Sequence, residues 1–222
     1  MVIEAFPPLS EADENGFLAV GGDLEPESLL LAYRNGIFPW PLRERQLAWF
    51  SPPQRGVLFL KDFRPGRTLQ KVRNRPGWSY SFNKRFDEVI TACALSSHRP
   101  GQSGTWITKQ MVRGYNEFHR AGFAHSVESY FEGDLVGGLY GVAIGGFFAG
   151  ESMFFKRSDA SKLALWWLVD HLKSLDVSWI DCQMVTPLFH SFGAVEVPRE
   201  RYTEMLMGVL DRDITLFPRK EC

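Results

Sequence analysis

The chain has 222 residues, of which 45% are apolar, and its formal net charge is −1. This length and apolar content are enough to build one large domain, or a large and a small one, so they exclude a disordered chain. The N-terminus lacks the basic and apolar regions of a signal peptide. The longest uncharged run, Leu135 to Gly150, is shorter than the roughly 20 apolar residues of a spanning helix. We therefore expect a cytoplasmic protein without a membrane segment.

The cysteines and histidines do not follow the spacing of a metal site. Cys93, Cys182 and Cys222 lie far apart, form no C-x-x-C pair, and leave one thiol unpaired in any disulfide scheme. The five histidines also lack zinc-ligand spacing. We expect a reducing compartment and no bound metal.

Residues 1 to about 60 are rich in Pro and Gly, which predicts a small, loop-rich N-terminal domain. Within it, Pro26 to Asn35 is predicted as a short helix, because Pro stands at its start and Gly36 follows its end. A strand over Gln54 to Leu60 leads out of this domain, and Arg64 to Arg67 is the predicted junction. The predicted domains are residues 1–60 and 61–222.

The remaining chain begins with helical patterns and then changes to a period of two. Three helices are predicted, over Thr68–Asn74, Phe86–Leu95 and Thr108–Ala121. Three strands of an antiparallel meander follow, over Ala124–Phe131, Leu135–Ile144 and Phe147–Phe155. The last predicted elements are a helix from Ser158 or Asp159 to Lys173, a strand Ser178–Met184, a helix Pro187–Phe192, a strand Val195–Val197 and a helix Arg201–Leu210. This order predicts an α+β fold with a mixed, Gcn5-type acetyltransferase-like (GNAT-like) sheet.

Charge is distributed unevenly along the chain. Residues 61–85 carry eight Lys or Arg and one acid, a net +7, whereas the rest carries 17 basic and 25 acidic residues, a net −8. Aromatic residues alternate with these basic residues, as in a surface that follows phosphates and stacks bases. A solvated basic face explains the same pattern, so both interpretations stay open.

Several reaction classes lack their sequence motifs. The chain contains no G-x-x-x-x-G-K-[ST] phosphate loop and no G-x-S-x-G nucleophile elbow. The turn before the predicted helix at residue 158, Phe155 to Lys162, has no glycine to bring backbone N–H groups against the pyrophosphate of coenzyme A. An acetyltransferase-like sheet with this turn implies a different activated acyl donor.

Polar residues interrupt two strands that are otherwise apolar. Asp181 and Gln183 share one face of their strand with Trp179, while Ile180 and Cys182 point to the other face. A buried carboxylate costs several kcal/mol unless it is paired or hydrogen-bonded. Glu151 interrupts the preceding strand in the same way. Structural ion pairs explain each acid alone, but two carboxylates and an amide on one sheet favour a site that holds an amine.

The chain resembles the leucyl/phenylalanyl-tRNA–protein transferase family over nearly its whole length. The resemblance rests on eight blocks in the same order: residues Asn15–Leu24, Gly36–Trp40, Trp49–Pro52, Gly104–Thr108, Ala124–Glu128, Gly150–Phe154, Ala160–Lys162 and Ile180–Gln183. A series of ordered blocks is far more specific than a single short motif. One departure is the D-x-Q motif, which family members follow with Asn and His, whereas this chain has Thr186, Pro187 and Leu188.

The resemblance implies an activity and a set of site residues. The family transfers Leu or Phe, and Met less well, from aminoacyl-tRNA to the N-terminal Arg or Lys of a protein, which marks that protein for degradation. Its catalytic pair corresponds to Asp181 and Gln183. Its substrate-binding residues correspond to Trp40, Trp106, Leu139, Glu151, Leu168 and Ile180, where Leu139 and Leu168 replace bulkier residues. For the tRNA acceptor stem we predict contacts from Arg67, Lys71, Arg73 and Arg75.

The predicted chemistry requires no cofactor, because an aminoacyl-tRNA ester is already activated. The protein must align a neutral amine with the ester carbonyl and stabilise the oxyanion. We expect Asp181 to orient Gln183 and to help receive the amine proton, and Gln183 to position the amine. We expect a monomer.

Three other functions remain open. The first is an acyl-CoA N-acyltransferase on the same fold, and the second is an aminoacyl-tRNA-dependent ligase acting on cell-wall peptides. The third is a non-catalytic tRNA-binding protein, which would have no need of the pair Asp181 and Gln183.

Overall fold

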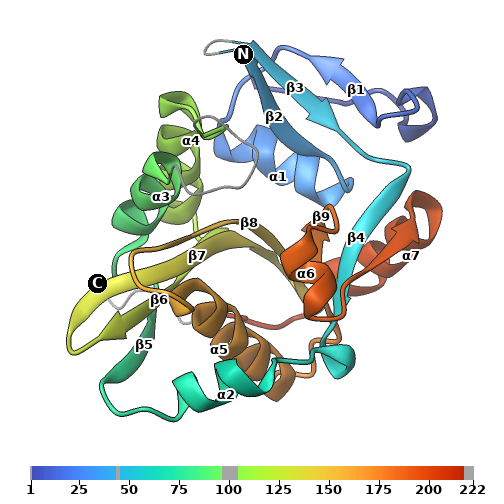
Figure 1. The fold of residues 1–222 in the computed structure, drawn as a ribbon. Helices are drawn as coiled ribbons and strands as arrows, with labels where there is room; N and C mark the ends of the chain where they lie inside the picture. Colours follow the sequence, from blue (N-terminus) through green and yellow to red (C-terminus); the bar gives the residue numbers. More distant parts are fainter. Residues whose placement is uncertain (1, 44–45, 97–104, 218–222) are drawn as a thin grey trace.

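The computed structural model describes residues 2–43, 46–96 and 105–217, which form two β-sheets and seven α-helices (Figure 1). The helices are α1 (Pro26–Arg34), α2 (Arg67–Arg73), α3 (Phe86–Leu95), α4 (Lys109–Arg120), α5 (Ala160–Ser174), α6 (Pro187–Ser191) and α7 (Arg199–Leu210). The strands are β1 (Phe17–Val20), β2 (Phe38–Arg43), β3 (Gln46–Phe50), β4 (Gln54–Phe59), β5 (Trp78–Phe82), β6 (Ala124–Phe131), β7 (Asp134–Ile144), β8 (Phe147–Phe155), β9 (Trp179–Gln183) and β10 (Val195–Pro198).

The larger sheet has seven strands in the order β10-β4-β9-β8-β7-β6-β5. All neighbouring strands are antiparallel except β8 and β9, which run parallel and are connected through α5. This arrangement confirms the predicted α+β class and mixed sheet. A parallel pair needs such a crossover helix, and here α5 returns the chain along one face of the sheet.

Helices cover both faces of the larger sheet. One hydrophobic core joins that sheet to α1, α3, α4 and α7, and a second core joins it to α2 and α5 (Figure 1). The side chain of Thr108 caps α4 by accepting a hydrogen bond from the Met111 backbone N–H at 3.2 Å. Gly137 allows α5 to lie close to β7, because a Cβ atom at this position would stand 2.5 Å from that of Ala160.

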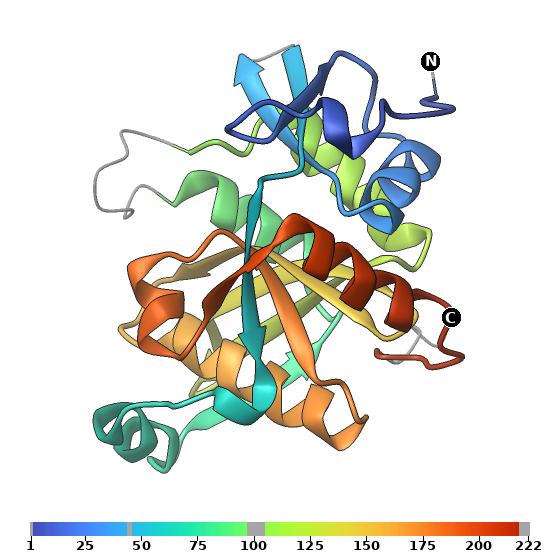
Figure 2. The same cartoon turned by 90° about the vertical axis from the view of Figure 1, so that its right-hand side faces the viewer.

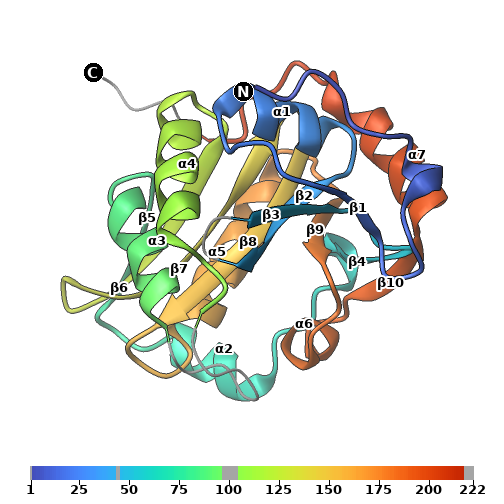
Figure 3. The ribbon, with the colours of Figure 1, turned by 90° about the horizontal axis from the view of Figure 1, so that it is seen from above.

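The N-terminal segment forms the smaller sheet, in the order β1-β3-β2, together with α1. Its apolar side chains, such as Tyr33 and Phe38, belong to the same core as Tyr140, Trp179 and Tyr202 of the following segment. Viewed from above, this small sheet and α1 lie over the strands of the larger sheet (Figure 3). The two segments therefore bury one another's apolar surface.

Most predicted elements lie within two residues of the observed ones. The predicted meander coincides with β6 to β8, and the predicted strand at residues 54–60 is β4. That strand pairs with β9 and β10 in the larger sheet, although it precedes residue 61 (Figure 2). The domain boundary at residues 60 and 61 stays a prediction. No prediction covered β1, β2, β3 or β5. Prolines interrupt β2, and β1 and β3 do not alternate polar with apolar residues, whereas β5 alternates Ser with aromatic residues and so did carry a strand signal.

Among the helices that the structure describes, none is long and apolar enough to cross a bilayer.

Candidate active site

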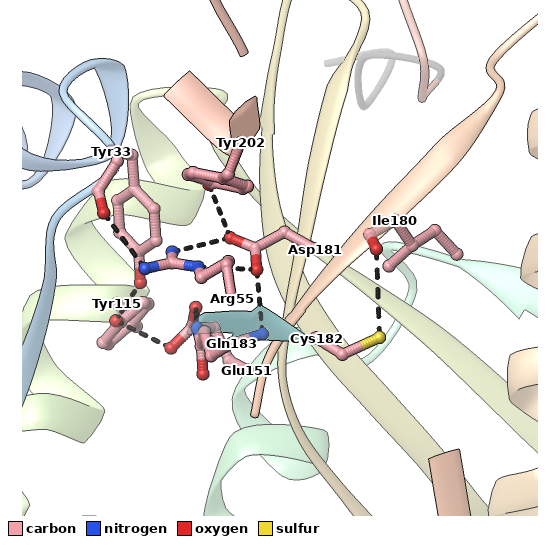
Figure 4. Close-up of polar contacts among 10 residues, drawn as sticks. Tyr33, Arg55, Tyr115, Glu151, Ile180, Asp181, Cys182, Gln183 and Tyr202 are labelled. Atoms are coloured by element: carbon pink, nitrogen blue, oxygen red, sulfur yellow. Dashed lines mark hydrogen bonds and ion pairs between the residues drawn. The ribbon is translucent and has the colours of Figure 1, made fainter. Parts of the chain in front are cut away.

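The candidate active site lies where β8 and β9 diverge. These parallel strands share a single pair of register partners, Ala149 and Asp181. Because the strands run in the same direction, Glu151 and Gln183 lie opposite each other two residues further along. Their side chains meet there, with Gln183 Nε2 donating a hydrogen bond to Glu151 Oε1 at 2.6 Å (Figure 4).

Two β-bulges aim the side chains at this point. In β8, Gly150 pairs with Gly141 and Ser152 with Tyr140, so Glu151 has no partner in β7. A bulge breaks the alternation of side chains and redirects one of them. As a result Glu151 points toward α1 and α4, although Met153, two residues later, packs in the core on the α5 side.

A second bulge shapes the end of β9. Gly56 and Val57 of β4 pair with Gln183 and Asp181, so Cys182 is the unpaired residue. Gln183 itself has a φ angle of +60°, and the N–H of Met184 donates to the carbonyl of Cys182 at 2.6 Å across it. Few residues other than Gly adopt such a φ. The strand therefore ends in a tight turn at Gln183.

Asp181 is fully buried and its carboxylate accepts four hydrogen bonds. Arg55 donates two of them, from Nε to Oδ1 at 2.9 Å and from Nη2 to Oδ2 at 2.7 Å. The Tyr202 hydroxyl donates to Oδ2 and the Gln183 backbone N–H to Oδ1, both at 2.8 Å (Figure 4). The structural ion pair that the sequence left open thus exists for Asp181.

Arg55 connects three parts of the chain around this carboxylate. Burial lowers its pKa, but the charge of Asp181, its hydrogen bonds with Arg55 and the neighbouring Tyr202 and Glu151 together raise the pKa of Arg55 overall. Its guanidinium lies over the rings of Phe38 and Tyr202, at 4.7 and 4.6 Å, and also donates to the carbonyl of Gly36 at 3.0 Å. The ion pair therefore joins β4 and β9 to α7 and to the start of β2.

Glu151 lies in a second hydrogen-bonded chain. The Tyr115 hydroxyl, from α4, donates to Glu151 Oε2 at 3.1 Å, and the hydroxyls of Tyr115 and Tyr33 are 2.5 Å apart. Burial raises the pKa of Glu151 to about 7, hydrogen bonds from the two tyrosines and Gln183 oppose this rise, and the charge of Asp181 adds to it. A carboxyl group that titrates near neutral pH in a hydrogen-bonded site is typical of a functional position.

Four members of these networks were not predicted from the sequence: Tyr33, Arg55, Tyr115 and Tyr202. A signal existed for Arg55, because a charged residue at the start of an apolar strand needs a counter-charge as much as Asp181 does. No pattern marked the three tyrosines, since each occupies an ordinary apolar position of its helix and only the tertiary structure shows where its hydroxyl points.

The structure divides the predicted substrate-binding residues into two groups. Trp40 and Trp106 stack on each other, with ring centroids 4.8 Å apart, and pack against the core that contains Tyr33 and Tyr115. Leu139, Leu168 and Ile180 are 3%, 1% and 1% exposed and belong to the core on the α5 side. Ile180 directly precedes Asp181 in β9, so the apolar group and the polar site lie on opposite faces of that strand.

The four predicted tRNA-binding residues lie on α2 and just after it. Arg67, Lys71 and Arg75 are exposed. Arg73 is partly buried, forms an ion pair with Asp170 at 2.7 Å and lies over the ring of Trp166 at 4.4 Å. Arg73 thus holds α2 against α5.

A cleft of about 530 Å³ lies beyond α2. Its lining combines basic, acidic and aromatic side chains, among them Arg75, Arg157, Glu132, Asp159, Trp78 and Phe131. Of the aromatic residues that alternate with the basic ones, Tyr80 and Phe82 stack on Trp167 of α5. Packing inside the protein therefore accounts for part of the aromatic pattern.

Comparison with known proteins gives similarity over nearly the whole chain. Residues 57–207 match the family model described as "Leucyl/phenylalanyl-tRNA protein transferase", and residues 22–53 match the N-terminal domain of the same family. Proteins named leucyl/phenylalanyl-tRNA--protein transferase are 48% identical in Syntrophotalea carbinolica (96% of this chain, 93% of the relative), 49% in Dechloromonas aromatica (93% and 89%) and 46% in Pseudomonas fluorescens (93% and 92%).

Solved structures align more weakly. A GCN5-related N-acetyltransferase from Kribbella flavida is 11% identical, with a TM-score of 0.37, over 77% of this chain and 59% of that chain.

Proposed function

This chain belongs to the leucyl/phenylalanyl-tRNA–protein transferase family, and from that membership we propose its substrates and the roles of its site residues. The family reaction is the transfer of an aminoacyl group from tRNA to a protein. The proposed donors are Leu-tRNA and Phe-tRNA, with Met-tRNA used less well. The proposed acceptor is the N-terminal Arg or Lys of a protein, which the product marks for degradation.

One observation supports this assignment above the others: Gln183 is held through both its backbone and its side chain at the divergence of β8 and β9. Its backbone N–H donates to Asp181 and its side-chain N–H donates to Glu151. With Nε2 donating to Glu151, Oε1 is the side-chain atom of Gln183 that can accept a hydrogen bond from an incoming amine. We assign Gln183 the role of orienting the attacking α-amine.

Asp181 takes a positioning role in this proposal, in place of the proton-accepting role expected from the sequence. Both of its oxygens already accept hydrogen bonds, and Arg55 neutralises its charge. Its oxygens are therefore not offered to the incoming amine, and the carboxylate instead fixes the turn that carries Gln183. In the reaction the amine nitrogen bonds to the ester carbonyl carbon, and the bond to the ribose oxygen breaks. That oxygen takes the proton, directly or through water, and leaves as a hydroxyl group.

The apolar group next to Ile180 is the proposed contact for the donor side chain. The side chains of Leu139, Leu168 and Ile180 are hydrocarbon and are packed in the core. A pocket opened among them would separate leucine from phenylalanine by about 1–3 kcal/mol and so would accept both. Trp40 and Trp106 are the proposed aromatic contact for the aminoacyl end of the tRNA. Their stacked rings offer a face to a base.

We propose that Arg67, Lys71 and Arg75 contact phosphates of the tRNA acceptor stem. These side chains are exposed on α2 and just after it. Arg73 instead forms an ion pair with Asp170 of α5 and so fixes α2 against the protein. Contacts of this kind recognise the charge and shape of the RNA and do not depend on its base sequence. The enzyme is proposed to act as a cytoplasmic monomer without a cofactor, because the ester supplies the activation.

A transfer assay tests this function directly. The protein is incubated with labelled Leu-tRNA and with a peptide that begins with Arg, beside a peptide that begins with Gly. Label is expected on the Arg peptide only, and Asp181→Ala is expected to abolish it. Label on neither peptide would contradict the proposed function.

The same assay separates the other candidate functions. Binding of tRNA without transfer would favour a non-catalytic tRNA-binding protein. Product formed from an acyl-CoA donor would favour an acyl-CoA N-acyltransferase.

A further inference from the structure

The tyrosine pair behind Glu151 has no part in the roles assigned so far. We propose that Tyr115 and Tyr33 are positioning residues for the acceptor amine: they keep the Glu151 carboxylate ionised and in place, which turns the Gln183 carbonyl oxygen toward the amine. This inference rests on the proposed function, because it concerns the group that orients the acceptor.

The first step concerns the direction of the hydrogen bond between Glu151 and Gln183. An ionised carboxylate only accepts hydrogen bonds, so Gln183 must present Nε2 to it, as observed at 2.6 Å. The amide oxygen then points away from Glu151. If Glu151 carries a proton on Oε1, that proton is donated to Gln183, and the amide must turn its oxygen toward Glu151. The amine would then face an N–H group, which cannot accept its hydrogen bond.

The second step concerns the oxygen that would receive such a proton. Tyr115 donates to Oε2 of Glu151, so that oxygen is occupied by a donor. Oε1 is the oxygen that faces Gln183, so a proton on Oε1 would be donated to the amide. Protonation of Oε1 and reversal of the Gln183 amide are consequently coupled by geometry.

The third step concerns the ability of the tyrosines to remain donors. Burial raises the pKa values of Tyr33 and Tyr115 well above the ordinary value, and the charge of Glu151 raises them further. Both side chains are fully buried, one on α1 and the other on α4, so they form no path for protons to solvent. Their hydroxyl groups oppose the effect of burial on the pKa of Glu151, so a larger share of the carboxyl group is ionised near neutral pH than burial alone would allow.

The test begins with a measurement that does not depend on activity. Glutamate labelled with ¹³C at Cδ is titrated by NMR, and the Glu151 signal is identified by its loss in Glu151→Gln. Removing one hydrogen-bond donor to a carboxylate raises its titration midpoint by about one pH unit. We expect this rise in Tyr115→Phe and in Tyr33→Phe, and a larger rise in the double variant.

Tyr80→Phe is the matched control for this titration. It also removes one hydroxyl from a partly buried tyrosine, but on the α5 side, where that hydroxyl makes no hydrogen bond to the described residues. The Glu151 midpoint should stay unchanged in Tyr80→Phe. A midpoint that also stays unchanged in Tyr115→Phe and Tyr33→Phe would overturn the proposal.

Single-turnover transfer to an Arg peptide provides the second measurement. For a midpoint raised from about 7 to about 8, the rate in Tyr115→Phe should fall about fivefold at pH 7 and less than twofold at pH 8.5. The KM for aminoacyl-tRNA should not change. A loss equal at both pH values would indicate a structural defect and overturn the inference, whereas no transfer by the unmodified protein would contradict the proposed function instead.

Discussion

Arg55 is the single residue on which the most contacts of the site depend. Its guanidinium pairs with both oxygens of Asp181 in a fully buried position. Removing one partner of a buried ion pair leaves the other charge uncompensated, which costs about 3–5 kcal/mol. Arg55→Met should therefore lower the free energy of unfolding by about that amount, as measured by urea denaturation. Arg55→Met combined with Asp181→Leu should recover much of the loss, and an equal loss in both variants would argue against this explanation.

Glu151 makes stability depend on pH in the opposite sense to an ordinary salt-bridged acid. Its pKa is raised from 4.5 to about 7 in the folded protein, first of all by burial. Between these pH values the folded state holds a proton that the unfolded state has released. The free energy of unfolding therefore falls as pH rises through this window, by up to about 3 kcal/mol.

The variant Glu151→Gln tests this dependence, because its amide does not titrate. The difference in unfolding free energy between Glu151→Gln and the unmodified protein should grow in favour of the variant from pH 4.5 to pH 7.5. Urea denaturation at several pH values measures it. A difference that is constant with pH would mean that Glu151 keeps an ordinary pKa.

Among the elements, α2 shows two different uses of basic side chains. Arg67, Lys71 and Arg75 are exposed, whereas Arg73 is tied to Asp170 and Trp166. Each of Arg67→Ala, Lys71→Ala and Arg75→Ala should weaken tRNA binding equally for different tRNAs. Each should also reduce the slope of log K against log salt by about 0.7–0.9.

Filter binding at several salt concentrations measures both effects, and Arg73→Ala is the matched variant for comparison. It should loosen the packing of α2 on α5 and lower the melting temperature. If the slope of log K against log salt is unchanged in all four variants, α2 does not contact the tRNA.

For the whole molecule, the shared core predicts that the two segments fold together. Tyr33 and Phe38 contribute to the same core as Trp179 and Tyr202, and Arg55 precedes the segment matched by the larger family model. A fragment of residues 57–222 would expose that core and leave Asp181 unpaired. We expect it to show no cooperative thermal transition by near-ultraviolet circular dichroism. A transition at the midpoint of the full chain would show instead that the segments fold independently.

The order of helices and strands was predictable because it depends on local patterns. The meander, α3 and the strand that carries Asp181 follow from periodicity and turn residues within a few positions. The same periodicity placed Asp181 on the face opposite Ile180 and Cys182, as the two cores confirm. Strands β1 to β3 and β5 were not predicted. β1 and β5 pair with strands well away in the sequence, β3 and β6, whereas β2 pairs with the neighbouring β3 but is interrupted by prolines.

By itself, the sequence determined the α+β class, the family and the pair of polar residues in β9, because each depends on residue types in order along the chain. Only the tertiary structure decided what these residues contact. Arg55 lies 126 positions from Asp181, and Tyr33 lies 82 positions from Tyr115. Two bulges and one turn at Gln183 then set the directions of the side chains. Side-chain contacts between distant segments depend on backbone direction at single residues, which periodicity does not encode.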